Sequence, residues 1–536
     1  MDLRSQVQAW IDDDPDPLTS AQLQLWLDTD NEVELRTSFS GFLQFGTAGL
    51  RGPLRPGPSG MNRAVVGRTA CAIATYMRER NLNSVVIGRD ARHGSEEFTQ
   101  ETAQIMSGAG MKVYILPRPL PTPVLAFATN ELKCDVGIMV TASHNPPQDN
   151  GYKVYLGGTV DGIHYRGSQI ISPTDEAIAV HIDAITTLAN QPRGNQWSVV
   201  DEKIISKYIG ITAAIATKPG TLKIVYSAMH GVGTQTLQQV FAAAGFAAPI
   251  LVAAQAQPDP DFPTVAFPNP EEPGAIDLAL ETARSSNADL VIANDPDADR
   301  CAAAVKDPVT GWRMLRGDEL GAIFGESIAR NTSKGVFANS IVSSTILSKI
   351  AQHYHLEFKQ TLTGFKWLAK IEGLTFGYEE ALGYAVDAGT VNDKDGISAA
   401  IKLAQIASDL AAAGKTLLDL LDEIWARHGA HATEQISIRL GDLSEVATIM
   451  GRLRKNPPVE IAGHRVTSID DLSKPTDALP PTDGVRIWLG ANIRIIIRPS
   501  GTEAKMKCYI EVIEKDLALA GSVMNRLRGP LKELLS

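Results

Sequence analysis

Short apolar runs followed by amphipathic stretches repeat along most of the chain, and they predict strands that alternate with helices. The runs at 84–88, 111–116 and 135–140 have the length and composition of buried strands. A helix is expected to begin near Ser95, because a serine N-cap followed by two glutamates suits the first turn of a helix. Strands that alternate with helices favour parallel or mixed sheets covered on both faces.

Two further passes of the same pattern follow. The second has expected strands at 222–226, 250–253 and 288–293 and expected helices at 235–244 and 276–285, and the third, at 319–410, is mainly helical with a short strand near 335–338. Three similar α/β units of this size suggest a repeated module.

The last hundred residues have a different pattern. Expected strands at 436–440, 485–489 and 493–498 precede an expected helix at 517–527, with a loop rich in Pro, Asp and Thr at 474–483. The predicted fold class is therefore α/β, with three similar mixed-sheet domains and a smaller C-terminal α+β domain. We place the four domains at 1–207, 208–318, 319–433 and 434–536.

Composition and charge narrow the possible functions. The chain has 536 residues and a net charge of −11, which argues against a general nucleic-acid or anionic-membrane surface. Its longest apolar stretch, 240–254, is broken by Gly245 and Pro249 and is too short to span a membrane. The four cysteines form no CxxC pair and the N-terminus has no signal-peptide pattern, so we expect a cytoplasmic location.

The sequence Asp295-Pro-Asp297-Ala-Asp299-Arg300 directly follows an apolar strand. Three alternating carboxylates in a loop can converge on one hard cation, and oxygen ligands suit Mg²⁺. An EF-hand would need glycine where Arg300 stands and glutamate where Lys306 stands, so it is rejected. An exposed acidic turn is the alternative, although the adjacent arginine favours a metal together with a phosphoryl group.

Ser143 lies in Thr-Ala-Ser-His-Asn-Pro-Pro at 141–147, also straight after a strand. α/β sheets place their ligands at this end of the strands, and a serine there could accept a phosphoryl group. The surroundings do not form the Gly-x-Ser-x-Gly elbow of an esterase. The alternative is a turn fixed by Asn145-Pro146, in which Ser143 caps a helix.

Two further segments could bind a substrate. Arg498-Pro-Ser500-Gly-Thr-Glu follows an expected strand and offers an arginine, hydroxyls and backbone N–H groups to an anion. The segment 377–384, Gly-Tyr-Glu-Glu-Ala-Leu-Gly-Tyr, could accept hydrogen bonds from sugar hydroxyls. Each segment could equally be an ordinary surface turn.

Taken together and in this order, the four segments resemble the α-D-phosphohexomutase superfamily of phosphosugar mutases. The resemblance extends from Phe-Gly-Thr-Ala-Gly-Leu-Arg at 45–51 to the segment at 498–503. It implies four domains around one central cleft, to which each domain contributes one of the four loops. It also implies Mg²⁺ as cofactor, a sugar bisphosphate as activator and small sugar phosphates as the partners. It gives no expectation for the oligomeric state.

The resemblance also implies residue roles. Ser143 is matched to the phosphoserine, and its phosphate would join Asp295, Asp297 and Asp299 as metal ligands. The other matched positions are Arg51, His144 and Lys153 as catalytic residues, and Arg300, Thr363, Gly364, Glu379, Glu380, Lys394, Arg498, Ser500, Gly501 and Thr502 as substrate-binding residues. His144 and Lys153 remain alternatives for moving the proton of the sugar hydroxyl.

The implied activity is transfer of phosphate between two positions of one sugar through a bisphosphate. An α-phosphoglucomutase, with phosphomannomutase activity as a possible addition, is the first hypothesis, and a phosphopentomutase acting on ribose or deoxyribose 1-phosphate is the second. Ala381 stands where many hexose-specific members have serine, so one hydroxyl contact is missing. A sugar-phosphate phosphatase and a non-catalytic sugar-phosphate sensor are alternatives of other classes.

Overall fold

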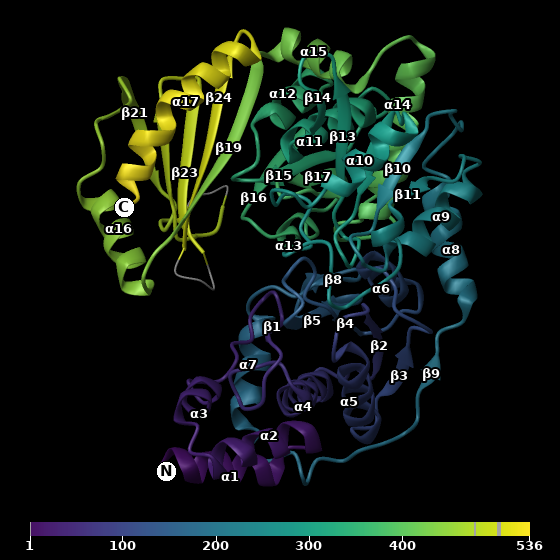
Figure 1. Ribbon diagram of the computed structural model, residues 1–536, viewed down its shortest axis with the longest axis vertical. Coiled ribbons are helices and arrows are strands. Elements are labelled where there is room, and N and C mark those ends of the chain that lie inside the picture. The colour runs from purple at the N-terminus through teal and green to yellow at the C-terminus, as the bar shows by residue number, and fades with distance from the viewer. Residues whose placement is uncertain (1, 476–478, 501–504) are drawn as a thin grey trace. The chain divides into compact units, whose positions relative to one another are not determined.

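The computed structural model describes residues 2–475, 479–500 and 505–536 (Figure 1). Within it the chain forms two compact units. Unit 1 comprises Met1–Leu315, Ala369–Ile371 and Ala381–Asp409, and unit 2 comprises Arg316–Leu368, Glu372–Glu380 and Leu410–Ser536. The chain therefore passes between the units several times in its third quarter, which hydrophobic patterning alone did not indicate.

Unit 1 begins with three helices that the sequence analysis did not predict, α1 Leu3–Asp13, α2 Pro17–Asp28 and α3 Glu32–Ser38. Each has an Asp or Asn at its N-cap whose side chain accepts a backbone N–H of the first turn. Arg68 anchors this segment, because its guanidinium lies 2.8 Å from Asp13 Oδ2 and 4.9 Å from the centre of the Trp10 ring.

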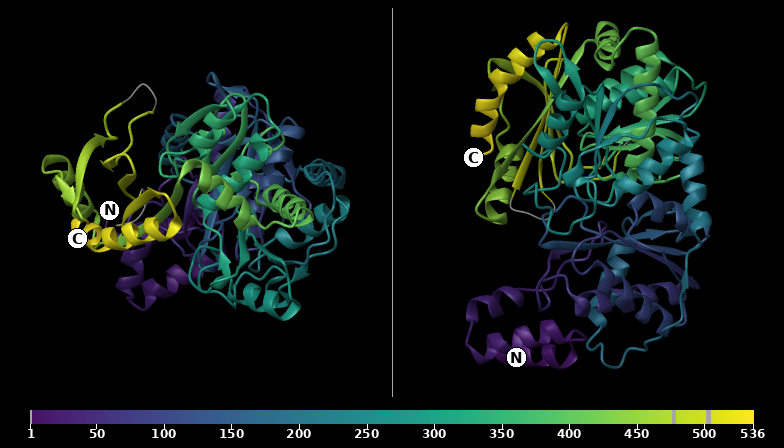
Figure 2. Two further views of the ribbon diagram at one scale, coloured as in Figure 1. Left: turned by 90° about the horizontal axis from the view of Figure 1, so that it is seen from above. Right: turned by 45° about the vertical axis from the view of Figure 1, so that its right-hand side comes forward.

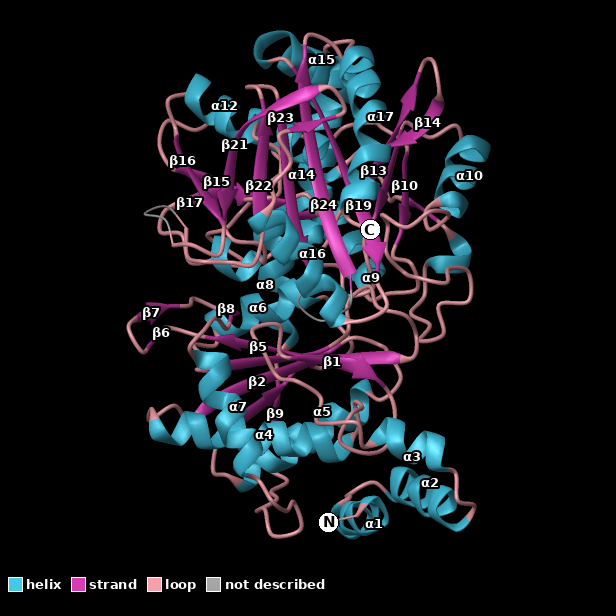
Figure 3. Ribbon diagram, turned by 90° about the vertical axis from the view of Figure 1, so that its left-hand side faces the viewer, coloured by secondary structure: helices cyan, strands magenta, loops and turns pink. Residues whose placement is uncertain are grey.

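The first sheet of unit 1 has seven strands in the order β1-β5-β4-β2-β3-β9, with β8 also paired to β5. β2, β3, β4 and β9 are parallel, whereas β5 runs antiparallel to β1 and β4. Figure 3 shows α4 on one face of this sheet and α6 on the other. The elements of this part of the chain are β1 Leu50–Pro53, α4 Arg63–Glu79, β2 Ser84–Arg89, α5 Ser95–Gly108, β3 Lys112–Ile115, α6 Thr122–Glu131, β4 Val136–Val140, β5 Asp149–Leu156, β6 Thr159–Val160, β7 Ile163–His164, β8 Ser168–Gln169, α7 Thr174–Ala184, β9 Ser198–Val199 and α8 Glu202–Ala213. β6 and β7 pair with each other as a separate two-stranded sheet.

The N-cap expected at Ser95 was wrong. α5 begins at Ser95 itself, its N-cap is Gly94 at φ +76°, and no side chain caps this end. Ser95 Oγ instead donates to Asp90 Oδ1 at 2.7 Å. The Ser95 hydroxyl is therefore bound to the buried Asp90 carboxylate and does not cap the helix.

The second sheet of unit 1 has five strands in the order β11-β10-β12-β13-β14. β10, β11 and β12 are parallel, and β13 and β14 complete the sheet as an antiparallel edge. The elements are β10 Ile224–Ser227, α9 Gly233–Ala243, β11 Ile250–Leu251, the short 3₁₀ helix Ala253–Gln255, α10 Asp277–Ser286, β12 Leu290–Ala293, β13 Ala302–Asp307 and β14 Gly311–Met314. β18 Gly383–Ala385 also belongs to unit 1, as does most of α14 Gly396–Ala412.

Unit 2 contains a parallel sheet and an antiparallel one. In the first, β15 pairs with both β16 and β17. Its elements are α11 Gly317–Ala329, β15 Val336–Ser340, α12 Ile346–His353, β16 Glu357–Thr361, α13 Phe365–Leu368, β17 Leu374–Glu379 and α15 Leu417–His428. Of these three strands the sequence analysis predicted only β15. β16 has one apolar residue, Phe358, among charged and polar ones and is half exposed, so it gives no clear strand signal.

The C-terminal sheet has six antiparallel strands in the order β19-β24-β23-β22-β21-β20, and α17 lies along it (Figure 2). Its elements are β19 Ala430–Arg439, α16 Leu443–Lys455, β20 Glu460–Ile461, β21 His464–Asp471, β22 Val485–Leu489, β23 Ile493–Pro499, β24 Lys505–Glu514 and α17 Leu517–Leu534. The expected fold class is confirmed: three α/β sheets precede a β-rich C-terminal domain.

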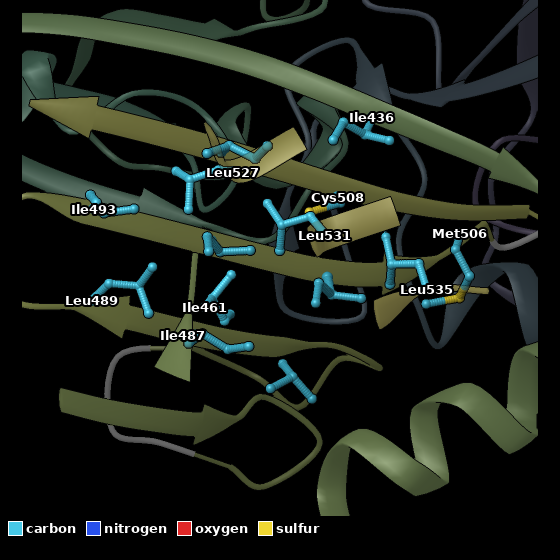
Figure 4. Close-up of a cluster of buried hydrophobic side chains, with 14 of the residues drawn as sticks. Ile436, Ile461, Ile487, Leu489, Ile493, Met506, Cys508, Leu527, Leu531 and Leu535 are labelled. Carbon is cyan, nitrogen blue, oxygen red and sulfur yellow. The ribbon is translucent and has the colours of Figure 1, made fainter. Parts of the chain in front are cut away.

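The expected end of the last helix, near Leu527, was wrong. α17 continues through Pro530 to Leu534. Leu527, Leu531 and Leu535 are fully buried in the core between α17 and its sheet (Figure 4). Burying leucines contributes roughly 1.5–3 kcal/mol each, which offsets the cost of a proline inside the helix.

A buried ion pair joins the C-terminal sheet to the loop after β15. Arg494 on β23 and Glu511 on β24 are directly opposite each other, 3.1 Å apart and almost fully buried. Arg494 donates to the carbonyls of Ile341 and Ser343, at 3.0 and 2.5 Å. Glu511 accepts from the Ser344 hydroxyl at 2.5 Å. The pair therefore fixes both the sheet and the loop.

Replacing Glu511 with glutamine is expected to destabilise unit 2 by roughly 3–5 kcal/mol, because Arg494 would stay buried without a counter-charge. Amide hydrogen exchange of peptides from β23 and β24 measures this loss. Glu514→Gln, on the same strand but less buried, should change exchange by less than about 0.5 kcal/mol. Equal effects of the two variants would contradict the prediction.

The same pair sets a pH dependence. Burial raises the pKa of Glu511, but Arg494 and His431 outweigh it and lower the value from 4.5 to about 2. The stabilisation is therefore complete above pH 4.5 and is lost as the pH falls towards 2. The difference in unfolding free energy between wild type and Glu511→Gln should therefore become smaller as the pH falls from 4.5 towards 2.

No helix in the described part of the chain has the length and apolar character needed to cross a membrane.

Candidate active site

The serine loop starts where β4 ends. β2 and β4 are parallel neighbours, so the segments that follow them emerge at the same edge of the sheet. Ser143 is 3% exposed and has φ +53°, a left-handed conformation unusual for a residue with a side chain. Its Oγ donates to Asp295 Oδ2 at 2.7 Å and lies 3.2 Å from His144 Nδ1. No helix follows, so Ser143 is not a helix cap.

The three aspartates follow β12 in the next sheet, and all are buried. The turn is closed by a hydrogen bond from Ala298 N–H to the Asp295 carbonyl at 2.8 Å. One carboxylate oxygen from each aspartate lies within 4.8 Å of those of the other two. The interpretation as an exposed acidic turn is therefore wrong, because carboxylates this close and this buried need a positive partner.

Lys153 supplies part of that charge from β5. Its ammonium lies 2.7 Å from Asp297 Oδ2 and 2.9 Å from Asp299 Oδ2. Lys394 Nζ lies 3.3 Å from Asp299 Oδ2. The other oxygens, Asp297 Oδ1 and Asp299 Oδ1, are buried and have no hydrogen-bond partner among the described residues. Buried carboxylate oxygens of this kind, within a cluster of three carboxylates, are the donors that a divalent cation such as Mg²⁺ prefers.

The carboxyl groups differ in their protonation. Burial, followed by the neighbouring Asp297 and Asp299, raises the pKa of Asp295 well above its usual value. Burial also opposes ionisation of the other two, but Lys153 lies against both and their pKa values are lowered. Ser143 is thus hydrogen-bonded to Asp295, the one aspartate of the three whose pKa is raised.

The remaining predicted residues of unit 1 lie around Ser143 and the three aspartates. Arg51 Nη1 donates to Asn145 Oδ1, next to the serine, at 3.0 Å. The backbone N–H of Arg300 donates to Asp295 Oδ1, and its guanidinium lies 3.6 Å from Glu271. Burial, followed by the charges of Arg300 and Arg51, lowers the pKa of His144 well below its usual value. The imidazole of His144 is therefore neutral at pH 7.

The predicted residues of unit 2 form a second group. Glu379 Oε1 accepts the backbone N–H of Gly364 at 2.7 Å, and Arg498 Nη1 donates to Thr363 Oγ1 at 2.5 Å. The Nε of Arg498 is buried and has no hydrogen-bond partner in the described ranges. The Ser500 N–H donates to the Lys505 carbonyl at 2.7 Å. Gly501 and Thr502 lie outside the described residues.

Glu380 differs from its neighbour Glu379. Its Oε2 accepts from Ser343 Oγ at 2.8 Å and Ser340 Oγ at 3.1 Å, so the loop after β15 holds it. Burial, followed by Glu379 and Asp318, raises its pKa to about 7. Glu380 is therefore partly protonated near neutral pH and can donate as well as accept a hydrogen bond.

Sequence reasoning missed two residues at the site of unit 1. Thr122, at the start of α6, donates from Oγ1 to Asp297 Oδ2 at 2.6 Å and from its N–H to the Asp297 carbonyl at 2.9 Å. Arg92 donates to carbonyls of the serine loop. Their only signal in the sequence is that each lies shortly after a strand of the first sheet, at the edge where Ser143 stands.

Comparison with known proteins gives a consistent result. Models of the phosphoglucomutase/phosphomannomutase α/β/α domains I, II and III match residues 43–188, 204–311 and 316–428. A Haemophilus influenzae protein named "Probable phosphomannomutase" is 46% identical over 482 residues, 89% of this chain and 98% of its own. A Mus musculus "Phosphopentomutase" is 34% identical over 95% of this chain and 90% of its own.

A solved structure shares the fold. It is that of a Burkholderia thailandensis "Phosphoglucomutase/phosphomannomutase family protein", with a TM-score of 0.71 at 19% identity, covering 91% of this chain and 97% of the other. The family models cover most of the chain, and each of the two relatives is covered over nine tenths of its length or more. This chain therefore belongs to the phosphoglucomutase/phosphomannomutase family of the α-D-phosphohexomutase superfamily, and it is a phosphosugar mutase.

Proposed function

We propose that this enzyme interconverts hexose 1-phosphates and hexose 6-phosphates, with glucose phosphate as the first substrate and mannose phosphate as a further one. Ser143 carries the phosphoryl group between the two positions. The observation that supports this most directly is the 2.7 Å contact between Ser143 Oγ and Asp295, inside a cluster of three buried carboxylates. A hydroxyl placed there can hold a phosphoryl group where cations neutralise its charge.

The reaction consists of two transfers of opposite direction. In the first, the bond between phosphorus and Ser143 Oγ breaks, and a sugar hydroxyl oxygen bonds to phosphorus as it gives up its proton. Ser143 Oγ takes up a proton, and the sugar becomes a bisphosphate. In the second, the other phosphate returns to Ser143 and the proton movements reverse. His144, whose Nδ1 lies 3.2 Å from Ser143 Oγ, is placed to move the proton between the sugar hydroxyl and Ser143 Oγ. Lys153 is the alternative residue for moving the proton of the sugar hydroxyl.

Charge neutralisation and alignment are the main requirements of such transfers. Asp295, Asp297 and Asp299 would hold Mg²⁺, which when bound supplies positive charge to the phosphoryl oxygens. Lys153, Lys394 and Arg300 add fixed positive charge around the same centre. Arg51 holds the serine loop through Asn145. A sugar bisphosphate is the expected activator, because it can phosphorylate Ser143.

We assign sugar and phosphate recognition to the residues of unit 2. Glu379 and Glu380 accept hydrogen bonds from sugar hydroxyls, and Thr363 and Gly364 support them. The Nε of Arg498 is buried without a hydrogen-bond partner among the described residues, and Ser500 has a hydroxyl, so both suit the phosphate that is not being transferred. Gly501 and Thr502 are assigned to the same phosphate on the sequence alone. We also propose, again from the sequence alone, the four domain boundaries given above and a cytoplasmic location.

The test is the specificity constant for glucose 1-phosphate, mannose 1-phosphate and ribose 1-phosphate, with Mg²⁺ and a trace of the matching bisphosphate. We expect a clear lead for a hexose phosphate. Released inorganic phosphate is measured in parallel, because phosphate release equal to substrate loss would mean a phosphatase instead. A protein that never acquires phosphate at Ser143 from a bisphosphate would be a non-catalytic sensor.

A phosphopentomutase is the second candidate. It is favoured by the 34% identity to the mouse protein of that name and by Ala381, which offers no hydroxyl to a hexose. Ala381→Ser is expected to raise the hexose-to-pentose ratio of specificity constants by roughly 3- to 10-fold, the value of one added hydrogen bond. An unchanged ratio would mean that Ala381 does not select the sugar.

A further inference from the structure

One buried arginine binds the serine loop from behind. Arg92 is 4% exposed, and its two terminal nitrogens donate to four main-chain carbonyls. Nη2 binds the carbonyls of Ser143 and Asn145, both at 2.6 Å, and Nη1 binds those of Pro146 and Asp149, at 2.8 and 3.1 Å. All four N–H bonds of these two nitrogens thus end within one loop.

The guanidinium is itself held in place. Its Nε lies 3.4 Å from Asp90 Oδ2, and the backbone N–H of Arg92 donates to Asp90 Oδ1 at 3.0 Å. The Phe262 ring centre lies 4.8 Å from the guanidinium carbon. Asp90 follows β2 directly, and its N–H donates to the Val140 carbonyl at the end of β4. Arg92 is therefore attached through Asp90 to the ends of β2 and β4 rather than to the serine loop.

Other hydrogen bonds also hold the serine loop, but they end on side chains. Arg51 Nη1 donates to Asn145 Oδ1 at 3.0 Å, Asn145 Nδ2 donates to Asp149 Oδ2 at 2.8 Å, and the Ser143 N–H donates to Thr141 Oγ1 at 2.9 Å. Ser143 is in the left-handed region, which is strained for a residue with a side chain. Pro146 and Pro147 have no N–H to donate. Two internal hydrogen bonds, from Asn145 N–H to the Ala142 carbonyl and from Asp149 N–H to that of Pro146, span the turn. The four carbonyls would lack these buried partners without Arg92.

We propose that Arg92 is the positioning residue that holds Ser143 ready for phosphoryl transfer. In a trans peptide the C=O and N–H point in opposite directions, so a Ser143 carbonyl bound by Arg92 turns the His144 N–H to the opposite side of the loop. Backbone N–H groups ordered in this way favour an anion beside them. The inference rests on the proposed role of Ser143 as phosphate carrier.

The first experiment tests, without any activity measurement, whether Arg92 holds the serine loop in place. Arg92→Lys keeps the charge but cannot reproduce the planar fork. Amide hydrogen exchange of the 141–149 segment should become at least roughly tenfold faster, because the Asn145 and Asp149 hydrogen bonds open more often. The control is Arg68→Lys, another buried arginine of unit 1, which binds Asp13 and the Ile185 carbonyl. It should leave exchange of this segment unchanged.

The second experiment measures the consequence. Arg92→Lys should lower kcat and the rate of Ser143 phosphorylation by a bisphosphate by roughly 10- to 100-fold, with KM changed by less than about threefold. Arg92→Ala should be partly rescued by added guanidinium ion, whereas Arg68→Lys should keep wild-type kcat. Equal kcat for Arg92→Lys and Arg68→Lys, or unchanged exchange of 141–149, would overturn the proposal. Wild-type protein without phosphate at Ser143 would instead contradict the proposed function, and the exchange result would stand.

Discussion

Ser143→Ala is expected to lower kcat by at least roughly 10⁴-fold, because the hydroxyl that carries the phosphoryl group is gone. The protein should still fold, since among the described residues Ser143 Oγ has two close partners, Asp295 and His144. The measurement combines coupled-assay kinetics with intact-mass analysis of protein treated with a sugar bisphosphate. Wild type should gain one phosphate, and Ser143→Ala should gain none.

A second variant separates the hydroxyl from the backbone conformation. Ser143 has φ +53°, and glycine adopts this conformation without strain. Ser143→Gly should therefore be more stable than Ser143→Ala by about 1 kcal/mol and equally inactive. Ser285→Ala, on the exposed side of α10, is the matched control and should keep full activity. Activity in Ser143→Gly would show that this hydroxyl is not the carrier.

The sequence predicted those parts of the site that follow a strand directly. An apolar run ending in Asp295 or in Thr141 identifies a strand, and the carboxyl end of a strand in an α/β sheet is where ligands bind. The loop of Ser143 and the loop of the three aspartates could therefore be found from the sequence alone. The same reasoning located six strands of unit 1 to within two residues, namely β2, β3, β4, β10, β11 and β12. It missed β1, β5 to β9, β13, β14 and β18.

Contacts between distant segments could not be predicted in this way. Lys153 reaches Asp297 across 144 residues of sequence, and Arg92 reaches the Ser143 loop because β2 and β4 are neighbours. Neither fact is present in local periodicity. β19 was expected to begin at 436 but begins at Ala430, because its pairing with β24 continues beyond the apolar stretch.

Asp297→Asn is expected to weaken Mg²⁺ binding and to lower kcat/KM by roughly 10²–10⁴-fold, since one of three converging carboxylates loses its charge. The side chain keeps its shape, and its oxygen can still accept from Thr122 and Lys153. The fold should therefore change little. Direct titration of Mg²⁺ by calorimetry gives the affinity independently of activity.

The charge balance predicts how the loss will show itself. Lys153 and Lys394 both lie against Asp299, so removing the charge of Asp297 leaves an excess of positive charge beside the remaining carboxylates. That excess repels a cation, and raising Mg²⁺ should restore only part of the activity. Asp183→Asn, an exposed change on α7, is the control for loss of one negative charge from unit 1. If Asp297→Asn bound Mg²⁺ as tightly as this control, the three aspartates would not be the metal site. The Oδ1 atoms of Asp297 and Asp299, which have no hydrogen-bond partner in the described part of the chain, would then need another cation to balance them.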